Sequence, residues 1–424
     1  MTTIGIIGAG TAGLHLGLRL QQHGIPVTIY SERDPAELRS ARLPNTVAHH
    51  APTLERQRAL GINHWDAPEL CTFSLGFCAS GPHPFGFEGR LEGPSQFMDY
   101  RVYQPRLAED FVARGGRLEV NPVDPAGVER LAQQHDLVVV ATGRAGLGHM
   151  FARMPEHSPH TGPQRLLFGG LFHGLRPLQP LRMQFNIAPG HGEIVEGRMV
   201  SVHGPMGSLF VEAIPGGAFE VLATRKPDED LRGFEALMLK LLQEHAPATF
   251  ERVDPAAFRL AGPLDWLQGS VTPVVRRAYT RLSGGRFVMA VGDTHVLHDP
   301  IAGQGANSAS ASGWLLAEAI HEALQAGQAF DEAFCQRAEA RAWEAVRATA
   351  IWNNALLQPP PPFMAEVLLA ASQDAKLAEE VIHTLMSPDR ALATFSSPEN
   401  CAALLARHGS SGATPAKEGS GPQA

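Results

Sequence analysis

Three glycines near the start of the chain, Gly8, Gly10 and Gly13, are spaced as Gly-x-Gly-x-x-Gly between a short apolar run and a helix-length segment. Glycines in this pattern allow a tight turn, a close approach of the backbone to a pyrophosphate, and close packing of a helix on a strand. The start of the helix adds N–H donors for an anion. Glu32 follows 19 residues after Gly13, where a carboxylate can accept hydrogen bonds from ribose hydroxyls. The pattern predicts a dinucleotide site, with a tight turn that binds nothing as the alternative.

A second glycine motif follows an aspartate in the last third of the chain. Gly292-Asp293 precedes Pro300, and the run 303–307, Gly-Gln-Gly-Ala-Asn, opens a helix. A helix start of this kind stabilises the negative charge that a reduced flavin carries near N1 and C2=O, and the aspartate can accept hydrogen bonds from a ribityl chain. The arrangement resembles that of FAD proteins similar to p-hydroxybenzoate hydroxylase, so FAD is the predicted cofactor. The alternative is a structural loop in which Asp293 only caps a helix.

We expect the cofactor to contact both motifs and a few polar side chains near them. The predicted set is Gly8, Gly10, Thr11, Ala12, Gly13, Glu32, Arg33, Arg42, Arg101, Gln104, Asp293, Pro300, Gly303, Gln304, Gly305, Ala306 and Asn307. For Arg42 and Arg101, a surface or ion-pair role is the alternative. His295, His298 and Asp299 have no further ligand cluster near them in the sequence, so no metal site is predicted.

The sequence offers no obvious means of reducing the flavin. It contains no second Gly-x-Gly-x-x-Gly unit for a nicotinamide. The strand that follows Asp136 ends in Ala-Thr-Gly-Arg at 141–144, and the mid-chain Asp-Gly segment that helps one-component hydroxylases of this class to dock NADPH has no clear counterpart. We therefore expect the protein to receive electrons, or reduced FAD itself, from elsewhere.

Five segments spread over the chain resemble the oxygenase components of two-component, FAD-dependent styrene monooxygenases, in the styrene and indole monooxygenase family. They are 6–17, 43–49, 99–105, 183–185 with 189–193, and 299–307. In that family reduced FAD reacts with O2 to give a C4a-hydroperoxide, whose distal oxygen converts an alkene into an epoxide. The resemblance implies conversion of styrene to styrene oxide, an NADH-dependent flavin reductase as partner, and a homodimer.

The segment 45–50 mixes hydrogen-bonding and apolar side chains directly after the first βαβ unit, which predicts that it forms the reaction pocket. The predicted catalytic residues are Asn45, Thr46, Val47 and His49. Asn45 would position the flavin or the peroxide. His49 is expected either to form a polar wall or carry a proton, or else to be a packed histidine with satisfied ring nitrogens. His50 is expected to point away.

Substrate preference is predicted from four positions that match the styrene type, namely Asn45, Val47, His49 and Ser95. Two further positions depart from it, because Thr72 and Leu75 stand where the styrene type has Tyr and His. We expect Thr72, Leu75 and Ser95 to belong to the substrate pocket. Apolar pockets discriminate weakly between similar aromatic substrates, so indole epoxidation is an alternative.

Two other functions were weighed against epoxidation. A halogenase of related fold would carry Gly-x-Trp-x-Trp-x-Ile-Pro, and the nearest stretch here is Leu-Asp-Trp-Leu-Gln-Gly at 264–269. A non-catalytic binding protein with a flavin-type fold is the other alternative, since fold does not fix function. The intact Asp293 and the segment around Gln304 argue against it, and uptake of FAD would separate the two.

Composition narrows the possible partners. The 424 residues include 35 Lys and Arg against 43 Asp and Glu, a formal net charge of −8, and no basic block, so nucleic acid is not an expected partner. Four cysteines are too few for a disulfide framework. No apolar stretch reaches the roughly 18 residues of a membrane span, and the first strand begins at residue 4, so we expect neither a membrane partner nor export from the cytoplasm.

The elements that must position these residues indicate an α/β protein. A Rossmann-type, doubly wound FAD domain is expected from 1–44, 92–160 and 276–330, and an antiparallel-sheet substrate domain from 45–91 and 161–275. A C-terminal helical region is expected over 331–408, followed by a disordered tail over 409–424. Within these regions the patterns predict strands at 71–79, 182–187 and 219–224, and helices at 103–115, 231–244 and 306–324.

Overall fold

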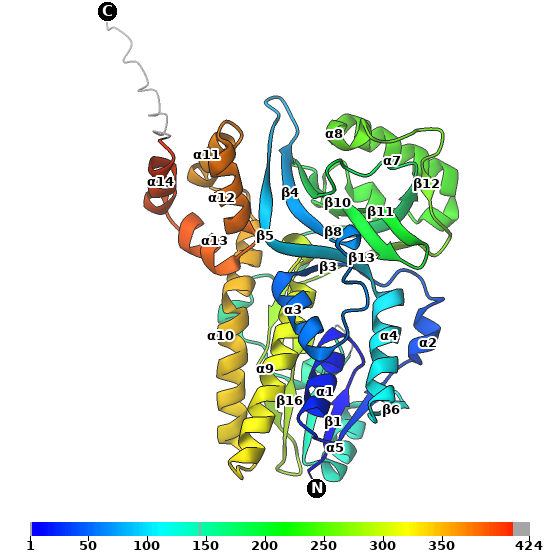
Figure 1. The fold of residues 1–424 in the computed structure, drawn as a ribbon, viewed down its shortest axis with the longest axis vertical. Helices are drawn as coiled ribbons and strands as arrows, with labels where there is room; N and C mark the ends of the chain where they lie inside the picture. Colours follow the sequence, from blue (N-terminus) through cyan, green and yellow to red (C-terminus); the bar gives the residue numbers. More distant parts are fainter. Residues whose placement is uncertain (1, 144–145, 410–424) are drawn as a thin grey trace, which may run out of the picture.

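A six-stranded sheet built around the first strand of the chain forms the lower part of the molecule (Figure 1). The structure is a computed structural model that describes residues 2–143 and 146–409; Arg144 and the predicted tail from residue 410 onward lie outside this range. The strand order is β15–β16–β7–β1–β2–β6, and every pair except β15 with β16 is parallel. The strands are β1 (Ile4–Ile7), β2 (Val27–Ser31), β6 (Arg117–Val120), β7 (Leu137–Val140), β15 (Tyr279–Arg281) and β16 (Phe287–Ala290).

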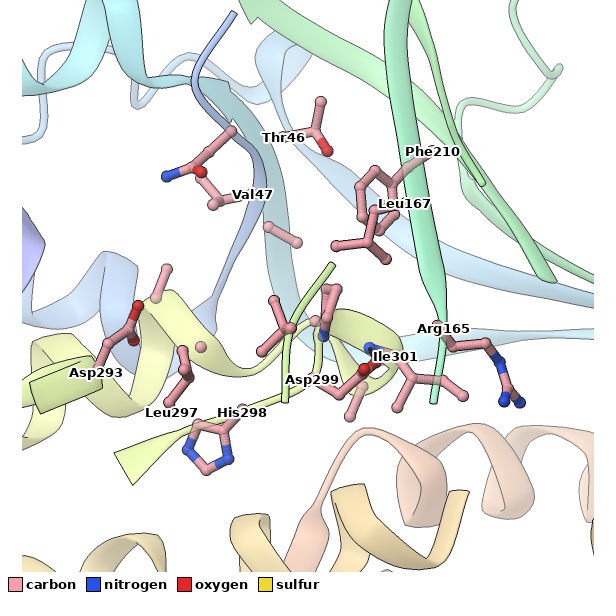
Figure 2. Close-up of a pocket in the computed structure, with 18 of the residues that line it drawn as sticks. Thr46, Val47, Arg165, Leu167, Phe210, Asp293, Leu297, His298, Asp299 and Ile301 are labelled. Carbon is pink, nitrogen blue, oxygen red and sulfur yellow. Dashed lines mark hydrogen bonds between the residues drawn. The ribbon is translucent and has the colours of Figure 1, made fainter. Parts of the chain in front are cut away.

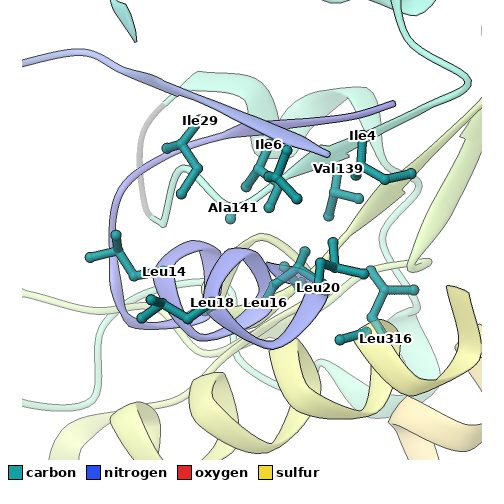
Figure 3. Packing of buried hydrophobic residues seen from close by; sticks show 14 of the residues in the cluster. Ile4, Ile6, Leu14, Leu16, Leu18, Leu20, Ile29, Val139, Ala141 and Leu316 are labelled. Atoms are coloured by element: carbon teal, nitrogen blue, oxygen red, sulfur yellow. The ribbon is translucent and has the colours of Figure 1, made fainter. Parts of the chain in front are cut away.

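Helices cover this sheet, and one of them is buried over most of its length. Figure 3 shows leucines of α1 (Thr11–Gln22) between the sheet and α9 (Gly305–Gln325). Leu14, Leu16, Leu18 and Leu20 are all fully buried, which explains why the segment lacks a polar face. The two helices approach so closely that a Cβ atom on Gly313 would lie 2.6 Å from the carbonyl oxygen of Ala12. The other helices of this part are α2 (Pro35–Leu38), α3 (Ala51–Leu60), α4 (Tyr100–Ala113) and α5 (Pro125–Gln134).

A second sheet, of nine strands, lies above the first (Figure 1). Its main order is β12–β8–β11–β10–β9–β4–β5–β3, with β13 paired to β8. Most pairs are antiparallel, as the sequence predicted, but β4 with β9 and β5 with β10 are parallel. The strands are β3 (Thr46–His50), β4 (Thr72–Ala79), β5 (Phe85–Asp99), β8 (Leu166–His173), β9 (Met183–Ala188), β10 (Gly192–Ser201), β11 (Gly204–Ala213), β12 (Arg259–Leu260) and β13 (Trp266–Ser270). A separate two-stranded pair joins β14 (Val274–Val275) to β17 (Val296–Leu297).

Strand β5 crosses the predicted domain boundary. It runs for 15 residues from Phe85 to Asp99, pairing first with β4 and then with β3. The boundary predicted at residue 92 is therefore wrong, because it falls inside one continuous strand. Asp99 ends the strand and accepts a hydrogen bond from the backbone N–H of Arg101, which starts α4. The second sheet thus passes directly into a helix of the first layer.

One predicted strand is a helix. Residues 219–224 alternate in polarity, but the structure forms α6 (Glu220–Thr224) there. Phe219 and Leu222 are both buried and stand three residues apart, which suits one face of a helix. They pack with Phe234 and Met238 of α7 (Leu231–His245), the helix that the sequence predicted over 231–244. A short helix, α8 (Pro247–Phe250), follows.

The C-terminal part is helical: α10 runs beside α9 of the first layer, and the helices after it lie at the side of the second sheet (Figure 1). They are α10 (Glu332–Leu356), α11 (Pro362–Ala371), α12 (Ala375–Leu385), α13 (Pro388–Phe395) and α14 (Pro398–Arg407). Val367, Leu377 and Val381 form their buried core together with Phe77 of β4. Among the described helices, none combines the length and the apolar character needed to cross a bilayer.

Candidate active site

A cavity of about 2090 Å³ lies between the two sheets and reaches the C-terminal helices. Pockets for one drug-sized ligand occupy roughly 300–1,000 Å³, so this cavity has room for a dinucleotide and a further small molecule. Many residues that the sequence predicted for the site line it. They are Gly8, Gly10, Thr11, Ala12, Glu32, Arg33, Asn45, Thr46, Val47, Leu75, Gln104, Asp293, Pro300, Gly303, Gly305 and Ala306.

The first glycine motif forms an open turn before α1. Gly8 has φ +119°, and a Cβ atom there would lie 2.3 Å from the carbonyl oxygen of Ala141. A Cβ atom on Gly13 would lie 2.0 Å from the carbonyl oxygen of Gly8, so Gly13 itself packs beneath the turn and does not line the cavity. At Gly10 the nearest atom would be 3.9 Å away, and no side chain of the described residues caps the helix. The turn therefore leaves space and N–H donors for a phosphate.

The second glycine motif brings another helix start to the same cavity. Gly292 has φ +59°, and a Cβ atom on it would lie 2.9 Å from the Cβ atom of Ala12, so Asp293 is held next to the first motif. Figure 2 shows Asp293 at one end of the pocket view. Within the described range no side chain caps α9, and the space in front of Gly305 is open. An acceptor for a ribityl chain and two helix starts for anionic groups fit FAD.

Two predicted cofactor ligands are corrected by the structure. Arg101 is 3% exposed and does not line the cavity, because its Nη2 atom lies 2.7 Å from Asp99 Oδ2 and 2.7 Å from Asp265 Oδ1. Arg42 does not line the cavity either, and its guanidinium stacks over the ring of Trp266, 3.7 Å from the ring centroid. Both arginines therefore take the ion-pair or surface role that was the alternative.

Two other residues of the second motif support the site from behind. Gln304 is the residue before α9 and does not line the cavity. Asn307 Oδ1 accepts hydrogen bonds from the backbone N–H of His50 at 2.9 Å and from Thr53 Oγ1 at 2.7 Å. Its Nδ2 atom donates to the carbonyl oxygens of Ala48 and Gly303, both at 3.0 Å. Asn307 thus fastens strand β3 to the start of α9.

Of the two adjacent histidines, His49 takes the packed position that was one of its two predicted alternatives, whereas His50, which was expected to point away, faces the cavity. His49 is fully buried outside the cavity, where its Nδ1 atom lies 3.0 Å from Gln57 Nε2 and its ring packs against Tyr103. His50 lines the cavity instead, since successive strand residues point to opposite faces. Its Nδ1 atom lies 2.9 Å from Ser95 Oγ, and its Nε2 atom has no partner among the described residues. Burial lowers the pKa of His49 to about 3 and that of His50 to about 4, so both rings are neutral.

Of the three predicted substrate residues, one lines the cavity and two do not. Leu75 lines the cavity, whereas Thr72 and Ser95 border a separate small pocket. Thr72 Oγ1 donates to the carbonyl oxygens of Ser74 and Leu181, both at 3.2 Å. Ser95 contacts the cavity lining through His50 and through Met183, whose Sδ atom lies 3.6 Å from Ser95 Oγ. Thr72 and Ser95 therefore do not line the cavity that we assign to the substrate, contrary to the prediction.

Apolar side chains from the second sheet and from the segment between Asp293 and Gly303 form an apolar wall of the cavity. Figure 2 shows Val47, Leu167, Phe210, Leu297 and Ile301 around the pocket. Sequence patterns predicted no role for most of these side chains, because the five come from five different elements and meet only in the fold. The cavity continues along the C-terminal helices, where its lining includes Phe77, Phe85, Phe185, Trp352, Met364 and Phe395.

Polar residues that sequence reasoning missed lie beside this wall. Arg165 forms two hydrogen bonds with Glu193, at 2.8 and 2.9 Å, and both side chains line the cavity. His298 and Asp299, which were considered only as metal ligands, line it as well. Within the described range, no group of three or more His, Cys, Asp or Glu side chains is placed to hold a metal ion.

Solved structures with this fold include several flavoproteins. The flavin-dependent brominase Bmp2 superposes with a TM-score of 0.65 at 15% identity, covering 96% of this chain and 99% of that one. A flavoprotein/dehydrogenase from Cytophaga hutchinsonii superposes with a TM-score of 0.68 at 14% identity over the same shares. PqsL from Pseudomonas aeruginosa, titled a probable FAD-dependent monooxygenase, gives 0.56 at 17% identity, covering 90% and 100%. At these identities the likeness shows the fold alone.

Sequence relatives are much closer. A family model described as "Styrene monooxygenase A putative substrate binding domain" matches residues 143–252. Styrene monooxygenase StyA from Pseudomonas fluorescens is 42% identical over 403 residues, covering 93% of this chain and 95% of the relative. A protein of the same name from a Pseudomonas species matches with the same identity and coverage. With this identity over nearly the full length, the chain belongs to the styrene monooxygenase oxygenase family.

Proposed function

We propose that this protein is the oxygenase component of a two-component, FAD-dependent monooxygenase that converts styrene to styrene oxide with O2. The observation that carries the proposal is a cavity with two uncapped helix starts at one end and an apolar wall at the other. The 42% identity to styrene monooxygenase StyA over 93% of the chain supports the same reaction. When bound in its reduced form, FAD would supply the activation of O2 and the oxygen atom that is transferred.

The residues of the two motifs would hold the cofactor along the cavity. The start of α1 at Gly10 and Thr11 would receive the pyrophosphate, and Glu32 would accept hydrogen bonds from the ribose. Asp293 would accept from the ribityl chain. The start of α9 at Gly305 would stabilise negative charge on the reduced ring.

The apolar wall would bind the vinyl-aromatic substrate and exclude water. Val47, Leu75 and Phe210 offer contact surface for a ring and no polar group that would need a partner. Oxygen transfer to an alkene needs no base to remove a substrate proton, so an apolar wall is sufficient on this side. His50 is neutral, and its Nε2 atom lies 3.7 Å from the position of a Cβ atom on Gly303, where it can form a hydrogen bond near the flavin ring. We assign to His50 the polar role that the sequence predicted for His49.

An NADH-dependent flavin reductase would supply reduced FAD. A homodimer and a cytoplasmic location, which the resemblance and the composition led us to expect, stay predictions. Indole remains the alternative substrate, because a wall of aliphatic and aromatic side chains separates styrene from indole only weakly.

The proposed function is tested by reducing FAD anaerobically with a separate NADH-dependent reductase and then mixing it with this protein, styrene and O2. We expect styrene oxide, with indole as a parallel substrate. Turnover with NAD(P)H and no reductase would contradict the two-component assignment. FAD uptake without any oxygenated product from either substrate would point instead to a binding protein.

A further inference from the structure

Two carboxyl groups from distant parts of the chain meet at the cavity wall. Glu212 lies near the end of β11, and Asp299 lies in the loop that leads to Pro300. The two side chains are fully buried, and each is close enough to shift the pKa of the other. Asp299 Oδ1 also accepts from the backbone N–H of Ile301 at 3.2 Å. Neither oxygen of Glu212 nor Oδ2 of Asp299 has a hydrogen-bond donor among the described residues.

The surroundings do not supply enough positive charge for both groups to ionise. Glu193 stands directly opposite Glu212 on β10, which adds a third carboxyl group. Arg165 is the cation that faces them, and both of its terminal hydrogen bonds to carboxylates go to Glu193. His298, the neighbour of Asp299, stays neutral because burial lowers its pKa to about 4. Two adjacent buried carboxyl groups in such a setting retain a proton between them at neutral pH.

The direction of both shifts agrees with a shared proton. Burial is the main cause that raises the pKa of Glu212 well above its ordinary range, and the neighbouring Asp299 and Glu193 charges raise it further. Burial also raises the pKa of Asp299 to about 6, against the opposing effects of the hydrogen bonds from Glu212 and Ile301. Both pKa values are therefore raised, as expected for two buried carboxyl groups that share one proton.

Of the two groups, Asp299 is the one that lines the cavity. Figure 2 shows it on the same stretch as His298 and Ile301, with Arg165, which directly precedes β8, also in view. Glu212 is fully buried and does not line the cavity. The loop continues through Pro300 and Gly303 to the helix start that we assign to the flavin ring. A proton held by this pair thus borders the cavity that we assign to the flavin and the substrate.

The proposed reaction consumes a proton. Anionic reduced FAD, O2, styrene and one proton give oxidised FAD, styrene oxide and water. The O–O bond breaks, one oxygen atom forms two bonds to the alkene carbons, and the flavin gives up two electrons. The other oxygen atom leaves as water with one proton from the flavin and one from elsewhere. We propose that Glu212 and Asp299 hold one proton jointly and that Asp299 passes it to the oxygen atom that leaves as water, an inference that rests on the proposed function.

The shared proton is tested first without cofactor or turnover. Infrared spectra of the FAD-free protein at pH 7 should contain a protonated-carboxyl band that shifts in D2O. Glu212→Gln should remove it, because the amide keeps the hydrogen bond to Asp299 and lacks the titrating proton. The control is Glu196→Gln, which replaces an equally buried carboxylate on the neighbouring strand β10 that Arg252 holds, and it should leave the band in place. A wild-type spectrum without the band, or a band that survives Glu212→Gln, would overturn the shared proton.

The role of the pair in the reaction is tested by single-turnover kinetics with prereduced FAD across pH. Glu212→Gln and Asp299→Asn should slow release of water and return of oxidised FAD by about 100-fold, the usual size of a general-acid contribution. The wild-type pH dependence should disappear in both variants, while the dissociation constants of FAD and styrene stay within about twofold. Rates and pH profiles equal to the wild type in both variants would refute the role. If the wild-type protein forms no epoxide, the proposed function fails, and the infrared result still decides whether the proton is shared.

Discussion

Replacing Arg101 by methionine should destabilise the fold and leave the affinity for FAD nearly unchanged. The guanidinium is buried between Asp99 and Asp265, with contacts of 2.7 Å to each. Its removal leaves two buried carboxylates without their cation, and breaking a buried ion pair costs about 3–5 kcal/mol. Because His203 Nε2 still lies 2.8 Å from Asp265 Oδ2, we expect the lower end of this range, about 3 kcal/mol.

The assay is urea unfolding of the FAD-free protein, so that cofactor binding does not add to the measured stability. The control is Arg39→Met, because Arg39 and its partner Glu109 are 46% and 52% exposed and such a pair contributes less than about 1 kcal/mol. FAD affinity is then measured by flavin fluorescence at a temperature where both variants are folded. An unchanged unfolding free energy together with a loss of FAD affinity of more than about tenfold would refute the reasoning and restore Arg101 as a cofactor ligand.

Three further predictions concern the glycine turn before α1, the stability of the fold at acid pH, and the apolar wall of the cavity. Gly13→Ala should abolish tight FAD binding, because its Cβ atom would lie 2.0 Å from the Gly8 carbonyl oxygen, whereas Gly162→Ala, with open space around it, should bind normally in the same titration. Acidification from pH 7 to pH 5 should lower the urea midpoint, because buried histidines with pKa values of about 3 to 4 stay neutral in the folded protein but gain protons below pH 6.5 in the unfolded chain. The raised pKa values of Glu212 and Asp299 act in the opposite sense but involve fewer groups. An unchanged midpoint would contradict the burial of these histidine rings. The histidines are His15, His49, His50, His295 and His298. Leu75→Asn should raise the KM for styrene about tenfold by placing an amide in the apolar wall, and the exposed Leu264→Asn should not.

The sequence predicted those parts of the fold in which binding the cofactor requires a backbone conformation that only certain residue types allow. The turn at Gly8 to Gly13 and the helix that begins near Gly305 were found because each needs a specific backbone conformation that only certain residues allow. The strand predicted at 219–224 failed because six residues can satisfy both a period of two and a spacing of three. Packing of Phe219 against α7 decides between them, and that contact is not encoded locally.

The candidate site was predicted less completely because side-chain direction depends on register and on distant partners. The segment 45–50 was correctly placed at the cavity, yet which histidine faces inward depends on the pairing of β3 with β5. A shift of one residue in that pairing would exchange the roles of His49 and His50. Arg101 stands in a segment that resembles the family, but Asp265, 164 residues away, determines what it binds. Glu212 was not predicted as a site residue, because its partner Asp299 lies in a distant segment of the chain.

The pairing of β9 with β4 has a consequence for building chimaeras within this family. The family model covers residues 143–252, which contain β8 to β11 but not β3, β4 or β5. If this stretch were expressed alone, β9 would lose its neighbour and expose an unpaired edge bearing Phe185 and Ile187. Exposed apolar strand edges recruit other chains and aggregate. A graft that is meant to transfer substrate preference must therefore carry residues 46–99 together with 143–252, because these two separate segments form one sheet.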